Sequence, residues 1–152
     1  MREVRSRDYT AADRDACLNV FDTNIPNFFA PEERAMFTAF LDGPVLKRPY
    51  LVLDTGKDII ACGGLKVLET TGSAFLSWGM VARPYHGQGV GRMLTQARLN
   101  LARQTEGITT VTLNTSQHTK GFYEKFGFVP VKVTPNGYGP NLDRWDMLLE
   151  LI

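Results

Sequence analysis

The sequence is short of the residues that mark several classes of protein. Only two of its 152 residues are cysteines, Cys17 and Cys62, which stand far apart without neighbours suited to bind a metal. We therefore expect no disulfide framework and no metal site, and we interpret both cysteines as small buried residues in a reducing compartment. The 17 basic and 16 acidic residues leave a net charge of only +1. Nucleic-acid binding would need a basic stripe that this balance does not supply.

Long apolar stretches are also missing. The N-terminal Met1–Arg5 lacks the apolar centre of a signal peptide, and no segment holds 18 consecutive apolar residues. No repeat, linker or low-complexity tract interrupts the chain. The remaining composition, 43% hydrophobic and 22% charged, is typical of an ordinary globular protein. We expect one domain over residues 1–152, in the cytoplasm, with no membrane partner; whether it forms a homodimer stays open.

Periodic apolar residues and turn residues predict the order of elements. Strands are expected at 2–6, 50–53, 58–68, 74–81, 108–113, 128–133 and 145–151, and helices beginning at Thr10, Pro31, Val90 and shortly before Phe122. The second helix is expected to bury Met36, Phe37, Phe40 and Leu41, and Pro135–Asn141 to form a long loop. The order β-α-α-β-β-β-α-β-α-β-β implies an α/β (α+β) fold, with a mixed, mostly antiparallel sheet of about seven strands flanked by four helices.

One stretch joins a strand signal to a helix signal through glycines. The apolar run Ala74–Val81 predicts a buried strand that ends before Pro84, which cannot donate to a sheet. Gly87, Gly89 and Gly91 follow at alternate positions. One helix face is then indicated by Val90, Met93, Leu94, Ala97 and Leu101. Such a helix start offers free N–H groups and a positive dipole end to an anion, although an ordinary tight turn fits the glycines alone equally well.

Two known phosphate loops do not match this stretch. A Walker loop needs Lys and Ser or Thr after its last glycine, where this chain has Arg92 and Met93. A dinucleotide fingerprint that starts at Gly87 needs Gly or Ala where Arg92 stands. An unrelated nucleotide-binding domain is therefore disfavoured.

The stretch resembles the acyl-CoA pyrophosphate loop of the GNAT N-acetyltransferase superfamily, Arg/Gln-x-x-Gly-x-Gly/Ala. His86-Gly87-Gln88-Gly89-Val90-Gly91 has both glycines of that motif and departs from it at His86. A second segment, Thr119–Phe128, is similar to the family's later motif, Ala-x-x-Phe-Tyr-x-Lys-x-Gly-Phe. It agrees at Phe122, Tyr123, Lys125, Gly127 and Phe128. The expected order of elements is also the GNAT order.

The resemblance implies an acetyl-CoA-dependent N-acetyltransferase in which a small-molecule or peptide amine attacks the thioester directly. In the family, the strand before the loop bulges, and a backbone N–H near Met80 or Val81 faces the thioester oxygen, while the pantetheine arm runs beside Val81–Arg83. Acetyl-CoA, as co-substrate, would be bound by Met80, Val81, Ala82, Arg83, His86, Gly87, Gln88, Gly89, Val90, Gly91, Arg92, Asn114, Lys120, Phe122, Tyr123 and Lys125.

The resemblance assigns Tyr123 as the general acid toward the departing thiolate. Proton transfer from a phenol with pKa near 10 to a thiolate near 8.5 is uphill by about 2 kcal/mol, so we expect Tyr123 to assist as a hydrogen-bond donor. His118 is a candidate general base because its ordinary pKa lies near neutral pH. Glu69, Asp143, Asp146 and a chain of water molecules stay open as alternatives.

The segments expected to select the acceptor are the loop Asn24–Phe29, the loop Tyr138–Arg144 and Trp78. A second class of function also stays open, a non-catalytic acyl-CoA-binding or sensing module on the same fold. Such a module would need the glycine loop but not Tyr123, so the presence of Tyr123 in its motif favours the enzyme.

Overall fold

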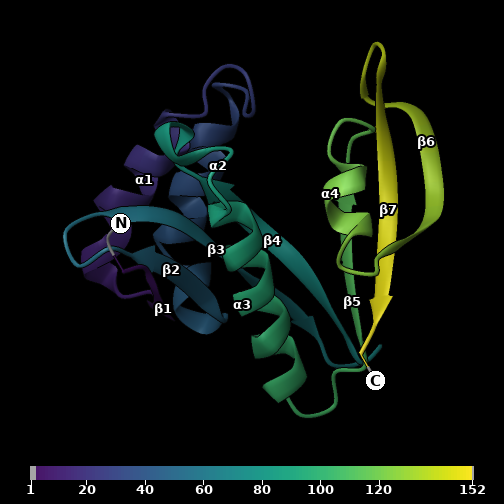
Figure 1. The fold of residues 1–152 in the computed structure, drawn as a ribbon, viewed down its shortest axis with the longest axis horizontal. Coiled ribbons are helices and arrows are strands. Elements are labelled where there is room, and N and C mark those ends of the chain that lie inside the picture. Colours follow the sequence, from purple (N-terminus) through teal and green to yellow (C-terminus); the bar gives the residue numbers. More distant parts are fainter. Residues whose placement is uncertain (1–2, 152) are drawn as a thin grey trace. The chain divides into compact units, whose positions relative to one another are not determined.

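The computed structural model describes residues 3–151, which form a seven-stranded sheet and four helices (Figure 1). The strands are β1 (Arg5–Asp8), β2 (Tyr50–Asp54), β3 (Ile59–Leu68), β4 (Ser73–Val81), β5 (Thr110–Thr115), β6 (Val129–Gly139) and β7 (Leu142–Glu150). The helices are α1 (Arg14–Asp22), α2 (Glu33–Leu41), α3 (Val90–Gln104) and α4 (Lys120–Glu124). The strand order is β1-β2-β3-β4-β5-β7-β6, in which β4 and β5 are parallel and the pairs β1–β2, β2–β3, β5–β7 and β6–β7 antiparallel. The expected fold class is confirmed.

The backbone divides into two compact units. The first comprises the chain up to Lys66 together with Ser77–Leu101, and the second comprises Val67–Leu76 together with the chain from Ala102. Because the units alternate along the sequence, no single linker separates them. None of the helices within residues 3–151 combines the length and the apolar character needed to cross a membrane.

In the first unit, successive residues of the strands contribute to two hydrophobic clusters. On one side, Val52, Cys62 and Met80 pack with buried residues of α1 and α2 such as Phe21 and Phe37. On the other side, Leu53 and Ile60 pack with Val90 and Leu94 of α3. In Figure 1, α3 accordingly crosses in front of β3, and α2 lies behind β2 and β3. This alternation, which follows from the two-residue period of a strand, places α3 on the face of β2 and β3 opposite to α1 and α2.

The second unit contains the beginning of β4, β5, the hairpin of β6 and β7, and α4. Ser73 to Phe75 of β4 pair with Thr110 to Thr112 of β5. The interior of this unit includes Val111, Phe128 and Met147, all almost fully buried. Gly127 follows α4 at φ +99°, a left-handed conformation that suits a glycine at a helix end.

Four sequence-based expectations were wrong in detail. The first strand spans Arg5–Asp8 and not 2–6, of which residue 2 lies outside the described residues. Met36 is 61% exposed, because the buried stripe of α2 is Phe37, Phe40 and Leu41. On α3, Met93 is exposed, while Arg98 is buried. The segment Pro135–Asn141 is no long loop, since β6 continues to Gly139 and β7 begins at Leu142.

Candidate functional site

The glycine stretch forms a tight connection between β4 and α3. Gly87 and Gly89 have φ values of +75° and +82°, in the left-handed region that favours glycine. The N–H of Met93 donates to the carbonyl oxygen of Gly89 over 3.1 Å, so the hydrogen-bonded turns of α3 begin at Gly89. The N–H groups of Val90, Gly91 and Arg92 therefore lie in the first turn, where an α-helix provides no internal acceptor.

The loop has room as well as donors. An ideal Cβ built on Gly87 or Gly89 would have no atom of the described residues within 4 Å. The positive end of the 15-residue helix α3 adds a favourable field for an anion at this point. These residues fit a pyrophosphate group held by backbone N–H donors.

The His86 side chain points back to the strand. Its Nε2 lies 2.7 Å from the carbonyl oxygen of Val81, and its ring lies edge-on to Phe28 with centroids 5.0 Å apart. Because a carbonyl oxygen only accepts, Nε2 carries the hydrogen in this bond. In this conformation His86 uses its Nε2 donor to fix the loop, whereas the resemblance implied that it binds acetyl-CoA.

Several backbone groups at the end of β4 have partners within the protein. The Val81 oxygen also accepts from Asn24 Nδ2 over 3.0 Å. The Ala82 N–H donates to Ile60 of β3 over 2.8 Å, and the Arg83 N–H donates to Thr23 Oγ1 over 3.0 Å. Fewer backbone groups of Val81–Arg83 are therefore left to bind the pantetheine arm than the sequence alone suggests.

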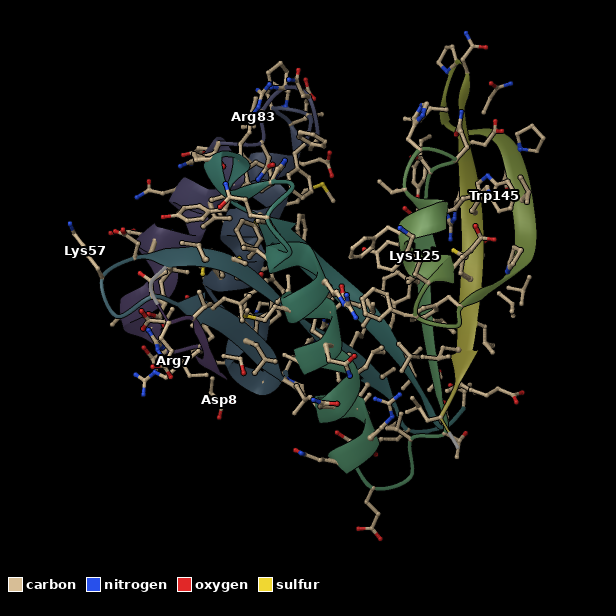
Figure 2. The ribbon with its side chains drawn as sticks, viewed as in Figure 1. Arg7, Asp8, Lys57, Arg83, Lys125 and Trp145 are labelled. Atoms are coloured by element: carbon tan, nitrogen blue, oxygen red, sulfur yellow. The ribbon has the colours of Figure 1, made fainter. Side chains whose placement is uncertain are left out.

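The segment after α1 is fastened to this end of β4. Asn24 is only 2% exposed, and its Nδ2 donates to the Val20 oxygen as well as to that of Val81. With its amide oxygen facing Arg83, Asn27 accepts from both terminal nitrogens of the guanidinium at 3.0 Å. Figure 2 shows the Arg83 side chain beside this segment. The sequence analysis expected this segment to select the acceptor and missed Asn24 as its anchor, because Asn24 and Val81 are 57 positions apart and no local pattern reports a contact over that separation.

β4 is kinked at Trp78, which has a φ of +46°. The Trp78 ring is partly buried against α2, where its centroid lies 5.1 Å from that of Phe37 and 6.2 Å from that of Phe40. A left-handed residue within a strand interrupts its regular alternation, as a bulge does. The resemblance implied a bulge in the strand before the glycine loop, and Trp78 is the residue at which β4 departs from an extended backbone.

The second unit holds the other predicted site residues. Tyr123 lies on the five-residue helix α4 and is half-buried. Its ring makes edge contacts with Phe122 and Phe128, at centroid distances of 5.0 and 6.0 Å. The motif thus brings three of its aromatic residues into one cluster.

Two further predicted ligands of acetyl-CoA are engaged with their neighbours. Asn114 Oδ1 accepts from the Tyr138 hydroxyl over 2.6 Å, and burial raises the pKa of Tyr138 above its ordinary value. Lys120 Nζ forms an ion pair with Glu124 at 3.2 Å and lies 4.8 Å from the centroid of the Trp145 ring. Figure 2 labels Trp145 on β7 and Lys125 directly after α4; Lys125 is exposed.

The candidate bases differ in their surroundings. His118 and Glu69 are exposed. Asp143 accepts from the Asn136 N–H over 2.9 Å, and Asp146 pairs with Arg144 at 3.0 Å. Asp143 therefore joins β6 to β7, and Asp146 is paired within β7.

Both cysteines lie in the hydrophobic cluster under α1 and α2, with no exposed surface. A hydrogen bond with Cys62, together with burial, raises the pKa of the Cys17 thiol well above its ordinary range. A protonated, inaccessible thiol is a poor nucleophile, which disfavours a covalent cysteine intermediate.

The chain matches the family model of the acetyltransferase (GNAT) domain over residues 47–130, more than half of its length. A comparison with curated proteins found no match.

The fold is similar to that of many solved structures. A GNAT-family protein from Desulfovibrio desulfuricans superposes with a TM-score of 0.85 at 22% identity, over 97% of this chain and 99% of the other. The ribosomal-protein-S18-alanine N-acetyltransferase of Escherichia coli gives 0.81 at 18% identity, over 97% and 94%. The protein yncA of Salmonella typhimurium, solved with its cofactor acetyl-CoA, gives 0.77 at 18% identity, over 99% and 95%. By its family match and its fold, the chain belongs to the GNAT acetyltransferase family.

Proposed function

We propose that this protein is an N-acetyltransferase that transfers the acetyl group of acetyl-CoA to an amine by direct attack in a ternary complex. The observation that carries the proposal is the loop from His86 to Val90, with its two left-handed glycines at the start of α3. This loop supplies N–H donors for a pyrophosphate, as its resemblance to the acyl-CoA loop of the GNAT superfamily implies. The similarity to yncA, which was solved with acetyl-CoA, supports the same ligand here.

The reaction requires an N–H donor for the charge that develops on the thioester oxygen. The Ala82 N–H bonds to β3, and successive backbone groups of a strand point to opposite edges, so the Val81 N–H points away from β3. We therefore assign this donor to Val81. The resemblance had left the choice between Val81 and Met80 open. One such donor contributes on the order of 10²–10³ in turnover in acyl-transfer enzymes.

The remaining steps concern protons. The attacking amine forms the new C–N bond and loses one proton, while the C–S bond breaks and the thiolate leaves. We assign Tyr123 as the hydrogen-bond donor to the departing sulfur and His118 as the acceptor of the amine proton, directly or through water. A lysine-like amine with a pKa near 10.4 is only about one part in 10³ neutral at pH 7, so this proton needs an acceptor.

The acceptor class is an amine, in a small molecule or at a peptide terminus. The fold neighbour from Escherichia coli is named for acetylating an alanine of a ribosomal protein. The segments Asn24–Phe29 and Tyr138–Arg144 supply aromatic side chains with few charges, which suit a small amine or an amino-acid-like ligand. A cytoplasmic location agrees with this chemistry and remains part of the proposal.

Two measurements test the proposed function. Calorimetric titration with acetyl-CoA should show binding, and dephospho-CoA should bind nearly as well if the pyrophosphate is the main anchor. An acceptor screen with acetyl-CoA, which follows the release of free thiol, should then identify an amine among amino acids, polyamines, aminoglycosides and peptide N-termini. Binding without thiol release for any amine would favour a sensing module, and absence of binding would refute both functions.

A further inference from the structure

Arg98 is a buried charged residue to which the reaction described above gives no role. It lies on α3 and is only 3% exposed. Its Nε and Nη2 donate to the carbonyl oxygen of Gly64 on β3, over 3.2 and 3.1 Å. Nη2 also donates to the carbonyl oxygen of Ser77 on β4, over 3.1 Å. A guanidinium withdrawn from water is stable only where its N–H groups find acceptors, and here it bridges two adjacent strands.

Tyr50 approaches the next residue of β4 from the opposite face. Its ring belongs to the cluster formed with α1 and α2, and its hydroxyl donates to the Trp78 oxygen over 2.8 Å. Burial raises the pKa of Tyr50 well above its ordinary value, so the hydroxyl remains a donor at neutral pH. The carbonyl groups of Ser77 and Trp78 are thus held from the two faces of the sheet, one by Arg98 and the other by Tyr50.

The glycines of β3 and β4 make room for these two side chains. A Cβ on Gly79 would lie 2.2 Å from Arg98 Nη1, and one on Gly63 would lie 3.1 Å from Arg98 Cζ. A Cβ on Gly64 would lie 2.2 Å from the Pro49 carbonyl oxygen and 2.6 Å from Tyr50 Cδ1, so the backbone that leads into β2 and the Tyr50 ring both approach it closely. Glycine within a strand commonly marks such a close approach.

The held segment is the kink at Trp78. A bulky residue at positive φ is a strained conformation, which persists only when its surroundings over-determine it. If Trp78 relaxed to an ordinary extended conformation, the peptide groups after it would turn, and the N–H groups of Met80 and Val81 would change direction.

We propose that Arg98 and Tyr50 are positioning residues that hold the kink of β4 at Ser77 and Trp78, and so aim the backbone N–H of Val81 at the thioester oxygen. This inference rests on the proposed function. It assigns Arg98 and Tyr50 no contact with the substrate, because both act through the backbone of β4.

The infrared carbonyl band of bound acetyl-CoA, isotope-labelled at the acetyl carbonyl, reports the N–H donor without any acceptor. In the wild-type protein the band should shift to lower frequency than in free acetyl-CoA. In Tyr50→Phe and Arg98→Lys the band should return toward its free position. Turnover should fall by about tenfold in both variants. This loss is smaller than the 10²–10³-fold loss expected when a donor is removed, because the N–H is misdirected and not absent. The acetyl-CoA Kd should change by less than about threefold.

Two matched variants control for the substitutions themselves. Tyr9→Phe removes a buried hydroxyl that has no hydrogen-bond partner among residues 3–151, from a ring edge-on to Tyr50. Arg103→Lys makes the same change as Arg98→Lys at an exposed position of α3. Both should keep the wild-type band and turnover.

The possible outcomes separate the two proposals. If wild-type protein does not bind acetyl-CoA, the proposed function fails and this inference fails with it. If wild-type protein binds with a shifted band and Tyr50→Phe keeps both that band and full turnover, only the inference is overturned. Tyr50→Phe decides the matter if Arg98→Lys does not fold, since it removes a single hydroxyl and keeps the ring.

Discussion

His86 donates the hydrogen on Nε2 to the Val81 carbonyl oxygen over 2.7 Å, and so joins the first residue of the glycine motif to the last residue of β4. The same oxygen accepts from Asn24, so its two acceptor positions are both used. The entrance to the loop is therefore fixed by the side chains of His86 and Asn24.

This relationship predicts a structural role for His86 in the loop. His86→Ala should lower the free energy of unfolding by about 1 kcal/mol, the net contribution of one hydrogen bond. The acetyl-CoA Kd should rise by less than about threefold, because the backbone donors stay in place. His86→Gln, which restores a residue usual in the family and can donate from its amide, should recover part of the stability. A loss of affinity of about tenfold in His86→Ala, with an unchanged urea midpoint, would show instead that the imidazole contacts the ligand.

Gly89 and Gly56 provide a matched pair for the anion site. Both have a left-handed φ, +82° and +88°, and a Cβ on either would meet no described atom within 4 Å. Gly89→Ala and Gly56→Ala should each cost about 1–2 kcal/mol of stability, because both place an L side chain at positive φ. Only Gly89→Ala should weaken acetyl-CoA binding, by about tenfold or more, since it displaces N–H donors to a charged group. Equal affinities of the two variants in calorimetric titration would refute the pyrophosphate cradle.

The anchoring of β1 predicts how stability depends on pH. Both oxygens of Asp13 accept from Arg7 at 2.8 Å, and this pair holds the pKa of Asp13 below its ordinary value. A carboxyl group whose pKa is depressed by folding stabilises the protein above its unfolded pKa of about 3.9, and this contribution disappears as the pH falls through the folded pKa. Wild-type protein should therefore lose stability below about pH 4.

Asp13→Asn should remove that dependence. At pH 7 it should cost about 1–2 kcal/mol, less than for a fully buried pair because the Arg7 side chain is 36% exposed. Urea unfolding at about pH 7 and below about pH 4 measures the difference. Asp15→Asn is the matched control, at a side chain that is 91% exposed. It should change neither the free energy of unfolding at pH 7 nor the loss of stability below about pH 4. An acid-induced loss of the same size in Asp13→Asn and wild type would assign the effect to other carboxyl groups.

Local patterns predicted the elements of this fold and the glycine loop because both depend on residues close in sequence. The apolar run to Val81 and the glycines that follow define their own strand and turn. Met36 was misplaced for the same reason, since a single residue of error turns a side chain by about 100° around a helix. The two closing strands were predicted, but their continuation through Pro135–Asn141 was missed because Pro135 and the nearby glycines indicate a loop, although proline is tolerated on an edge strand such as β6.

Arg98, Tyr50 and Asn24 could not be found in this way. Each donates to a backbone carbonyl that is distant in sequence. A hydrophobicity pattern also assigns a charged residue such as Arg98 to the exposed face of a helix, so its burial was not predicted. Gly63, Gly64 and Gly79 were the one available signal, because glycines within predicted strands suggest that another group approaches closely.

Tyr123 offers the sharpest test of the chemistry. Tyr123→Phe keeps the ring and its contacts with Phe122 and Phe128 and removes one hydroxyl, so stability should change by about 1 kcal/mol or less. Turnover should fall on the order of 10²-fold, the lower end for a positioned acid, while acetyl-CoA affinity stays nearly constant. The loss should shrink for a thioester whose thiol has a lower pKa, because a better leaving group needs less assistance from a donor. Steady-state turnover and calorimetric binding, measured side by side for wild type, Tyr123→Phe and the control Tyr9→Phe, check this. An active wild type with equal turnover in Tyr123→Phe would reduce Tyr123 to a packing residue and would leave the thiolate to be protonated by solvent.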